Sequence, residues 1–300
     1  MRILILGGDG MLGHKVFQTL ASRYEMFATF REPRGAWTRF PMYARAESQQ
    51  LIGGVNALDF HSIVRAVAQV QPDVIINCIG IIKQLKQAND PILSITINAL
   101  LPHRLADLCA ASRARLFHIS TDCVFSGRKG NYTEDDLTDA EDLYGRSKLL
   151  GEVNRADCLT LRTSIIGREF LKTTGLLEWF LSQRGGTVNG YRHAIYTGVT
   201  TQTLAQIIGD VIADQPRVSG IYQVASERIT KYELLIKIRA ALKLDITINP
   251  FDDPPCDRSL SAARFVAATG YRIPTWDEMI DALARDATPY DDWRKQNATA

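Results

Sequence analysis

The feature that most constrains the fold of this chain lies at its start, where an apolar strand runs directly into a glycine-rich turn. Residues 2–6 form the strand pattern, glycines follow at positions 7, 10 and 13, and a helical pattern begins at His14. In a dinucleotide-binding βαβ unit such glycines allow a tight turn, close approach of the backbone to a pyrophosphate, and close packing of helix on strand. The helix N-terminus then faces the phosphates. The contacts predicted for a dinucleotide at this turn are Gly7, Asp9, Gly10, Met11, Leu12 and Gly13.

The first half of the chain alternates short apolar runs with longer helical patterns, which is typical of a parallel sheet covered by helices. Nearly continuous apolar runs, such as residues 3–6 and 74–76, suit strands that are buried on both faces. The predicted strands are residues 2–6, 26–30, 74–77, 116–120 and 158–162, and the predicted helices are residues 14–22, 60–69, 98–111 and 144–155. We therefore predict an α/β fold built on a Rossmann-like, doubly wound parallel sheet.

Beyond residue 162 the alternation loosens, with a Gly-Gly turn at 185–186 and a proline-rich loop at 250–255. We predict an NAD(P)-binding Rossmann domain over residues 1–165 and a smaller C-terminal substrate lobe over residues 166–287. Segments of this lobe are free to return to the first domain. Residues 288–300 are predicted to form a polar tail that frays.

The composition of the 300 residues argues against several classes of partner. The net charge is only +2, from 35 basic and 33 acidic residues spread along the chain, so no electrostatic footprint for nucleic acid is visible. No segment approaches the ~20 apolar residues that span a bilayer, and no secretory leader precedes the first strand. Five cysteines stand at irregular spacing without a metal-type pair, so we expect reduced thiols, no metal site and a cytoplasmic location.

A second motif combines a phenol with a cation. Tyr144 and Lys148 stand at i and i+4, which places them on one face of a helix. A free tyrosine titrates near ~10, and a fixed cation beside it favours the phenolate and lowers the pKa. The residues Ser120-Thr121-Asp122 end an apolar run about twenty positions upstream and add hydroxyl groups. The pattern predicts a tyrosine that acts as a general acid or base.

The end of the second strand bears on which nicotinamide cofactor is used. An acidic residue there accepts from a ribose 2′-hydroxyl, whereas an arginine suits a 2′-phosphate. Here the strand ends in Arg31 with no carboxylate before it, so we predict NADPH, with NADH as the alternative. After the 74–77 strand, Gly80 lets backbone lie against a dinucleotide, and Asn98 is predicted to open a helix. Further cofactor contacts are predicted at Asn56, Cys78, Ile79 and Gly80.

Taken in order and at their spacing, these motifs resemble the extended short-chain dehydrogenase/reductase superfamily. The motifs are the glycine turn, residues 77–80, residues 120–122, the Tyr144/Lys148 pair and Arg162-Thr163-Ser164. Within that superfamily, residues 118–127, 144–152 and 161–164 are similar to the dTDP-4-dehydrorhamnose reductases. The resemblance covers about residues 1–230 and weakens beyond them.

The resemblance implies a role for each residue of the motifs. Thr121 would hydrogen-bond the substrate carbonyl, Tyr144 would give it a proton, and Lys148 would bind the nicotinamide ribose while lowering the pKa of Tyr144. Hydride would come from the nicotinamide ring. The implied cofactor contacts here are Ser120, Tyr144, Lys148 and Thr163, and the implied substrate contacts are Thr121, Asp122, Cys123, Val124, Arg192 and Arg258. Both arginines suit a diphosphate, whereas His193 is expected in a surface loop.

Cys123 departs from the pattern of related enzymes. In sugar-nucleotide dehydratases of the superfamily, Asp and then Glu follow the threonine, and this pair protonates and abstracts during loss of water. Here Asp122 is followed by Cys123, so the eliminating base is missing. This argues against a dehydratase and leaves ketone reduction. The rhamnose-pathway reductases commonly carry Tyr at this position, so the sugar stays open, and a buried inert thiol is the simplest interpretation.

Three functions remain for comparison with the structure. The leading one is NADPH-dependent reduction of the 4-keto group of a nucleotide-activated 6-deoxyhexose, for a surface polysaccharide sugar. The alternatives are a sugar-nucleotide epimerase with tightly bound NAD, and a regulatory subunit of the methionine adenosyltransferase type that retains the fold without turnover. The resemblance also allows a homodimer through the helices predicted at residues 98–111 and 144–155. The nucleotide, the product stereochemistry and the oligomeric state do not follow from the motifs.

Overall fold

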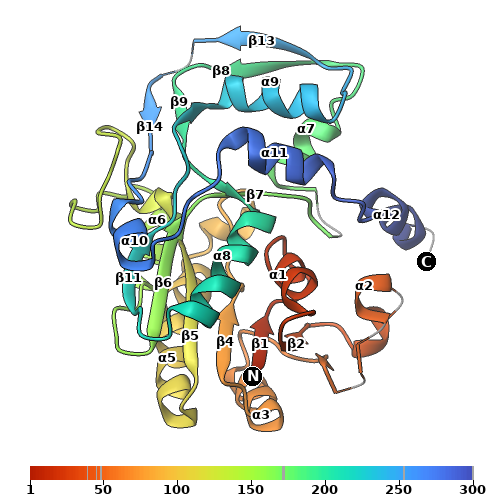
Figure 1. Ribbon diagram of the computed structural model, residues 1–300, viewed down its shortest axis with the longest axis vertical. Helices are drawn as coiled ribbons and strands as arrows, with labels where there is room; N and C mark the ends of the chain where they lie inside the picture. Colours follow the sequence, from red (N-terminus) through yellow and green to blue (C-terminus); the bar gives the residue numbers. More distant parts are fainter. Residues whose placement is uncertain (39, 45, 48, 171–172, 253, 299–300) are drawn as a thin grey trace.

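The computed structural model describes residues 1–300 except 39, 45, 48, 171–172, 253 and 299–300. Its centre is a parallel sheet with the strand order β11-β6-β5-β4-β1-β2-β3 (Figure 1). The strands of this sheet are β1 (Arg2–Leu6), β2 (Glu25–Thr29), β3 (Leu51–Ile52), β4 (Val74–Asn77), β5 (Arg115–Thr121), β6 (Cys158–Thr163) and β11 (Gly220–Gln223). The order reverses at β1, which is the doubly wound arrangement, so the predicted fold class is confirmed.

Helices cover both faces of the sheet, and the alternation of side chains along β1 shows how. Ile3 and Ile5 join the apolar core beneath α1 and α8, whereas Leu4 and Leu6 join the core beneath α3 and α5. A strand that is apolar at every position therefore fills two cores at once. These helices and the neighbouring α6 are α1 (Gly13–Leu20), α3 (Phe60–Val70), α5 (Leu101–Ser112), α6 (Leu143–Leu150) and α8 (Thr201–Asp214).

The rest of the chain gathers mostly beyond the carboxyl ends of the main strands, as Figure 1 shows for α9, α11, β8 and β13. Small sheets form there from β10 with β7, from β12-β9-β14 and from β13 with β8. Their strands are β7 (Ile165–Ile166), β8 (Thr187–Tyr191), β9 (Ala194–Tyr196), β10 (Val199–Thr200), β12 (Ile229–Thr230), β13 (Thr247–Phe251) and β14 (Cys256–Asp257). The helices are α7 (Leu176–Leu181), α9 (Lys231–Ala241), α10 (Ala263–Thr269), α11 (Trp276–Ala284) and α12 (Tyr290–Ala298). The division at residue 165 stays a prediction, and one segment of the second part, β11, lies in the main sheet.

Two helices differ from their predicted bounds for local reasons. The helix expected to open at Asn98 begins earlier, because Asp90 accepts hydrogen bonds from the amides of Ile92 and Leu93 and caps α4 (Pro91–Ser94). The chain continues through a π-helical turn, η3 (Ile95–Leu100), into α5, so Asn98 lies inside the helical stretch. Helix α6 ends at Leu150 rather than 155. A Cβ atom at Gly151 would lie 1.9 Å from the Asn98 carbonyl oxygen, so the two segments meet there.

The C-terminal residues also differ from the prediction. The expected polar tail at 288–300 is wrong for residues 290–298, which form helix α12 beside α1 and α2 (Figure 1). Tyr290 and Trp293 are only 1% and 4% exposed and anchor this helix in the main apolar core. The remaining short helices are η1 (Arg34–Ala36), α2 (Pro41–Ala44), η2 (Lys86–Asn89) and η4 (Asp122–Val124).

Candidate active site

The predicted site residues converge because they follow neighbouring parallel strands. The glycine turn follows β1, residues 77–80 end and follow β4, residues 121–124 end and follow β5, and Thr163 ends β6. Since β6, β5, β4 and β1 are adjacent and parallel, their carboxyl ends meet at one edge of the sheet. Ligands of doubly wound folds bind at this edge, beside the strand where the order reverses.

The glycine turn has the geometry that a pyrophosphate requires. Gly7 adopts φ +84°, which favours glycine, and a Cβ atom at Gly13 would lie 2.1 Å from the Gly7 carbonyl oxygen. A Cβ atom at Gly10 would meet only that same oxygen, at 3.4 Å, so the space beside Gly10 is open. In the described part of the chain no side chain caps α1 at Leu12, so an anion can approach the start of the helix, where the His14 amide already donates to the Gly10 carbonyl (3.3 Å). The residues present therefore fit a dinucleotide.

The loop after β4 is held open in the same way. A Cβ atom at Gly80 would meet only the Asn98 Oδ1 atom, at 3.5 Å. Asn98 accepts from the Ile81 amide (2.9 Å) and donates to the Ile81 carbonyl (3.1 Å) and the Ser147 hydroxyl (3.3 Å). The sequence predicted that Asn98 opens a helix and caps it, whereas in the structure it lies inside the helical stretch. It fastens the Gly80 loop to α6 instead.

The other predicted cofactor contacts vary in position. Arg31 is exposed just after β2, and the Asn56 side chain accepts from the Leu58 amide (3.1 Å) in the turn before α3. The Cys78 thiol is half-buried, and burial raises its pKa to about 12. Sequence reasoning made no assignment for Arg34, whose Nε atom is buried without a hydrogen-bond partner among the described residues.

Tyr144 lies in the first turn of α6, near Thr121 at the end of β5. Burial raises the pKa of its side chain, with further upward contributions from Cys123 and Asp122, and outweighs the lowering effect of the nearby Thr121. The largest contributions to this pKa do not include Lys148. That Lys148 lowers the pKa of Tyr144 stays a prediction. The phenol is held protonated, because burial disfavours the phenolate.

Lys148 lies one turn further along α6 and is 6% exposed. Its Nζ atom donates to the Ile119 carbonyl oxygen at 2.7 Å, which ties the helix to β5. Burial lowers the pKa of Lys148 to about 8, and the negative charge of Glu152 opposes this shift. The ammonium is therefore close to the point where it loses its charge in weakly alkaline solution.

A buried ion pair supports this part of the site and was missed by sequence reasoning. Glu152, just beyond α6, accepts from Arg162 Nε (2.8 Å) and Nη2 (2.7 Å). It also accepts from the Ser120 hydroxyl at 2.7 Å. The available signal was spacing, since Glu152 is four residues after Lys148. Ser120 thus points into this network, while the buried Thr163 donates to the Ser164 carbonyl oxygen (3.3 Å).

The residues at the end of β5 and just after it lie beside Tyr144. Thr121 Oγ1 donates to Asp122 Oδ1 at 3.1 Å, and burial raises the pKa of Asp122 while Arg258 opposes that shift. Burial also raises the pKa of Cys123 to about 12, in keeping with an inert thiol. Val124 is buried in a small apolar cluster with Phe125, so its side chain serves packing.

The two predicted arginines separate in the structure. Arg258 donates to the Phe125 carbonyl oxygen (2.9 Å) and is close enough to Asp122 and Cys123 to affect their pKa values. Arg192 instead pairs with Asp252 at 2.7 Å, where both side chains are exposed on the β8-β13 sheet. Lys231 also lowers the pKa of Asp122 and so adds a second positive charge near Arg258, which sequence reasoning missed.

A second buried phenol, Tyr196, lies near Asp122 and Cys123. Its place in the site was not predicted from the sequence. Burial raises the pKa of Tyr196, with upward contributions from Asp122 and Cys123, while the nearby Ser164 lowers it. His193, just before β9, is exposed.

Among the described residues, no three His, Cys, Asp or Glu side chains are placed to hold a metal ion. No helix in the described part of the chain is both long and apolar enough to cross a membrane.

A doubly wound sheet with a glycine turn after β1, a threonine at the end of β5 and a Tyr-x-x-x-Lys helix defines the extended short-chain dehydrogenase/reductase class. Within that class, the chain belongs to the family of the RmlD substrate binding domain, whose model matches residues 1–288. The family expectation drawn from the sequence motifs is confirmed.

Individual relatives carry two different names. The chain is 26% identical to methionine adenosyltransferase 2 subunit beta of Bos taurus over 269 residues, which is 85% of this chain and 76% of that protein. It is 33% identical to dTDP-4-dehydrorhamnose reductase of Mycolicibacterium smegmatis over 225 residues, 69% of this chain and 60% of that protein. The structure of dTDP-4-dehydrorhamnose reductase from Bacillus anthracis in complex with NADP shares the fold, with TM-score 0.76, 20% identity and coverage of 94% and 98%.

Proposed function

We propose that the protein reduces the 4-keto group of a nucleotide-activated 6-deoxyhexose with NADPH. The observation that carries the proposal is the buried, protonated Tyr144 phenol, which lies beside Thr121 at the edge of the sheet where the glycine turn lies. NADPH, when bound, supplies the hydride. The relatives named dTDP-4-dehydrorhamnose reductase support the substrate class, and the NADP complex of the Bacillus anthracis protein supports the cofactor.

Each residue then has a defined task. The Thr121 hydroxyl orients the substrate carbonyl oxygen, and Tyr144 gives that oxygen a proton as it gains negative charge. Lys148 holds the ribose hydroxyls and stabilises the phenolate that remains. Gly7, Gly10 and Gly13 place the turn against the pyrophosphate. The predicted contacts of Ser120, Thr163, Cys78 and Ile79 with the cofactor belong to the same proposal.

Residue 123 supports reduction over dehydration. Loss of water requires a base beside the sugar, and the Cys123 thiol has a pKa near 12 because it is buried. It therefore stays protonated at neutral pH and cannot take the place of a glutamate. Reduction needs only one proton donor beside the hydride source, and Tyr144 is that donor.

Positively charged side chains lie where the phosphate groups of the two proposed ligands, the sugar nucleotide and NADPH, would bind. Arg258 and Lys231 both act on Asp122 and supply positive charge for a sugar-linked diphosphate. Arg31 and Arg34 follow β2, where a 2′-phosphate of NADPH would lie. We place the enzyme in the cytoplasm, in the synthesis of a surface polysaccharide sugar, and expect it to form a homodimer.

The test is oxidation of NADPH and of NADH against a panel of nucleotide-linked 4-keto-6-deoxy sugars. Tyr144→Phe should lower kcat about 10²- to 10⁴-fold, since a positioned proton donor contributes that much, and leave the dissociation constant for NADPH unchanged. Tyr191→Phe, at an exposed tyrosine, is the matched control. Full turnover by Tyr144→Phe would show that another group donates the proton.

A second candidate, a regulatory subunit, is favoured by one observation. The relatives named methionine adenosyltransferase 2 subunit beta align with 85% of this chain, more than the 69% covered by the Mycolicibacterium smegmatis reductase. Stable co-purification with a methionine adenosyltransferase, without turnover of any keto-sugar in the panel, would favour this candidate. NAD that stays bound through purification would instead favour an epimerase.

A further inference from the structure

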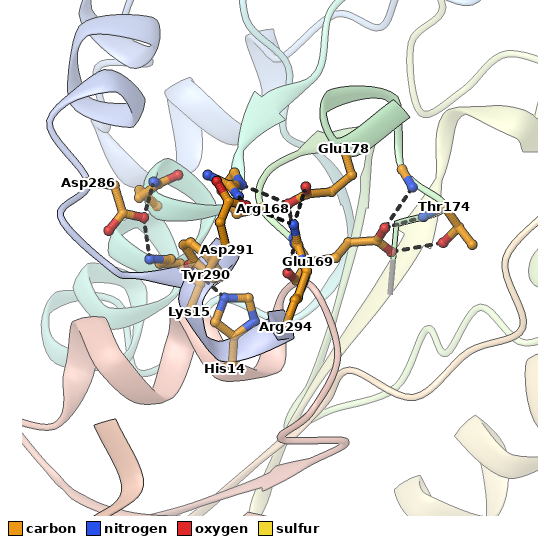
Figure 2. A network of polar contacts seen from close by, with 12 residues as sticks. His14, Lys15, Arg168, Glu169, Thr174, Glu178, Asp286, Tyr290, Asp291 and Arg294 are labelled. Carbon is orange, nitrogen blue, oxygen red and sulfur yellow. Dashed lines mark hydrogen bonds and ion pairs between the residues drawn. The ribbon is translucent and has the colours of Figure 1, made fainter. Parts of the chain in front are cut away.

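Helix α12 packs against the first turn of α1, although the two are far apart in the sequence. Figure 2 shows Tyr290 of α12 directed at His14, the residue that follows the last glycine of the turn. The Tyr290 hydroxyl oxygen lies 2.9 Å from His14 Nε2, across 276 residues of chain. The two rings meet edge to face, with centroids 5.6 Å apart. Both side chains are buried.

The hydrogen bonds of His14 continue this contact to the glycine turn. His14 Nδ1 lies 2.7 Å from the Gly10 carbonyl oxygen, and since a carbonyl only accepts, Nδ1 carries the hydrogen. Burial lowers the pKa of His14 to about 4, so the ring is neutral near pH 7 and its Nε2 atom accepts. The Tyr290 hydroxyl is therefore the donor. Two hydrogen bonds in series run from the C-terminal helix to the middle glycine of the turn.

A second set of contacts joins α12 to α7 and to the residues shortly before it, which are Arg168, Glu169, Thr174 and Gly175 and are called the segment before α7 below. Glu178 is buried between two guanidinium groups, at 2.8 Å from Arg168 Nε and 2.8 Å from Arg294 Nη1 (Figure 2). Arg168 also donates to Asp291 of α12 at 2.7 Å. On α1 itself, Lys15 pairs with Asp286 at 2.6 Å. The charges in this network alternate, which supports a fixed arrangement of α12 on its neighbours.

The segment that α12 holds also touches the glycine turn. The Glu169 carboxylate accepts from the Thr174 hydroxyl (2.9 Å) and the Gly175 amide (2.8 Å). A Cβ atom at Gly175 would lie 2.6 Å from Met11 Cε, so this segment packs on Met11 of the turn. Helix α12 therefore reaches the turn by two routes, through His14 and through the segment before α7.

We propose that α12 is a positioning element for the dinucleotide turn, in which Tyr290 and His14 fix the direction of the Gly10 peptide group. The Gly10 carbonyl and the Met11 N–H belong to one planar peptide unit, so holding the carbonyl also sets where the N–H points. Glycine permits this unit to rotate. The His14 ring restrains it together with the His14 amide, which donates to the same Gly10 carbonyl oxygen at 3.3 Å, and Tyr290 holds the ring in place. The inference rests on the proposed binding of a dinucleotide at this turn.

Tyr290→Phe tests the inference because it removes one hydroxyl and keeps the ring. The dissociation constant for NADPH, titrated by fluorescence, should rise about threefold to tenfold, as expected for one lost hydrogen bond. At saturating NADPH, kcat should stay that of the wild type, and hydrogen exchange at the Met11 amide should be faster. Tyr24→Phe is the matched control, since it removes a hydroxyl that donates to the Gly209 carbonyl (3.0 Å) between α1 and α8.

Each outcome decides the matter. Unchanged NADPH affinity and unchanged exchange at Met11 in Tyr290→Phe would overturn the positioning role while leaving the proposed function standing. The same changes in Tyr24→Phe would overturn it as well, because a general loosening of α1 would then explain them. A wild-type protein that binds neither NADPH nor NADH would remove the proposed function together with this inference.

Discussion

Burial shifts the pKa values of the two reactive side chains in opposite directions. The pKa of Tyr144 is raised and that of Lys148 is lowered to about 8, because each group is less stable in its charged form away from water. Tyr144 therefore keeps its proton throughout the neutral range. Lys148 is a cation only below about pH 8, and Glu152 supplies the charge that keeps its pKa from falling further.

The protonation of Lys148 predicts how activity depends on pH. If its positive charge serves catalysis, kcat/KM should fall as the pH rises through about 8, since the ammonium loses its proton there. Lys148→Arg keeps a permanent cation and should move the decline to higher pH, even if its overall rate is lower. The measurement is a pH profile of kcat/KM with NADPH and the best sugar of the panel. A wild-type profile that stays level across pH 8 would contradict the role of the charge.

The sequence predicted these two residues but not their electrostatics. The i, i+4 spacing was enough to place Tyr144 and Lys148 on one helix face, because that relation is local. The pKa of Tyr144 depends on Thr121, at the end of β5, and on Cys123, in the short helix that follows it. Spacing within one segment carries no information about such neighbours.

At the scale of single elements, α6 connects the reactive residues to the sheet. Its first turn is capped by Asp142, which accepts from the Gly145 amide at 2.7 Å, and the Lys148 ammonium holds its last turn to β5. The Glu152–Arg162 pair then joins the chain just beyond its end to β6, with 3% and 6% of the side chains exposed. Contacts at the first turn of α6, at its last turn and just beyond its end thus hold the helix in place, which fixes the direction of Tyr144.

The buried pair predicts a large change in stability. Glu152→Gln leaves the Arg162 guanidinium buried without its counter-charge, so the free energy of unfolding should fall by about 3–5 kcal/mol. Asp107→Asn is the control, because it breaks a pair with Arg155 that is largely exposed, and such pairs contribute about 0–1 kcal/mol. Urea unfolding followed by tryptophan fluorescence measures both. If the free energy of unfolding falls by a similar amount in the two variants, the buried pair stabilises the fold no more than the exposed pair does.

Elements were predictable from sequence wherever the signal was local and long. The apolar runs of β1, β4 and β5 and the helix after the glycine turn stand within about two residues of their predicted bounds. The two-residue strand β3 and the β8-β13 pair were not predicted. A strand of two residues has no periodicity to detect, and β8 meets β13 only after the chain has passed through α8 and α9.

At the scale of the whole molecule, several exposed apolar side chains lie on, or just before, the two helices predicted to form a dimer. Ile92, Ile95 and Leu100, on α4 and η3, are 76%, 48% and 48% exposed, and Leu150, which ends α6, is 64% exposed. The two helical stretches touch where Gly151 meets Asn98. Sequence alone did not reveal this surface, since the π-helical turn before α5 changes which side chains face outward.

We predict that two copies of the chain associate through this surface, because apolar side chains gathered on adjoining helices favour burial against a partner. Leu150→Lys places a charge in the predicted contact and should shift the protein from dimer to monomer in size-exclusion chromatography with light scattering. Leu137→Lys is the control, since Leu137 is 85% exposed and belongs to neither helical stretch. Turnover per chain should persist in the Leu150→Lys monomer, as Thr121, Tyr144 and Lys148 all come from one copy. A wild-type protein that stays monomeric at every concentration, or an equal effect of Leu137→Lys, would refute an interface at this surface.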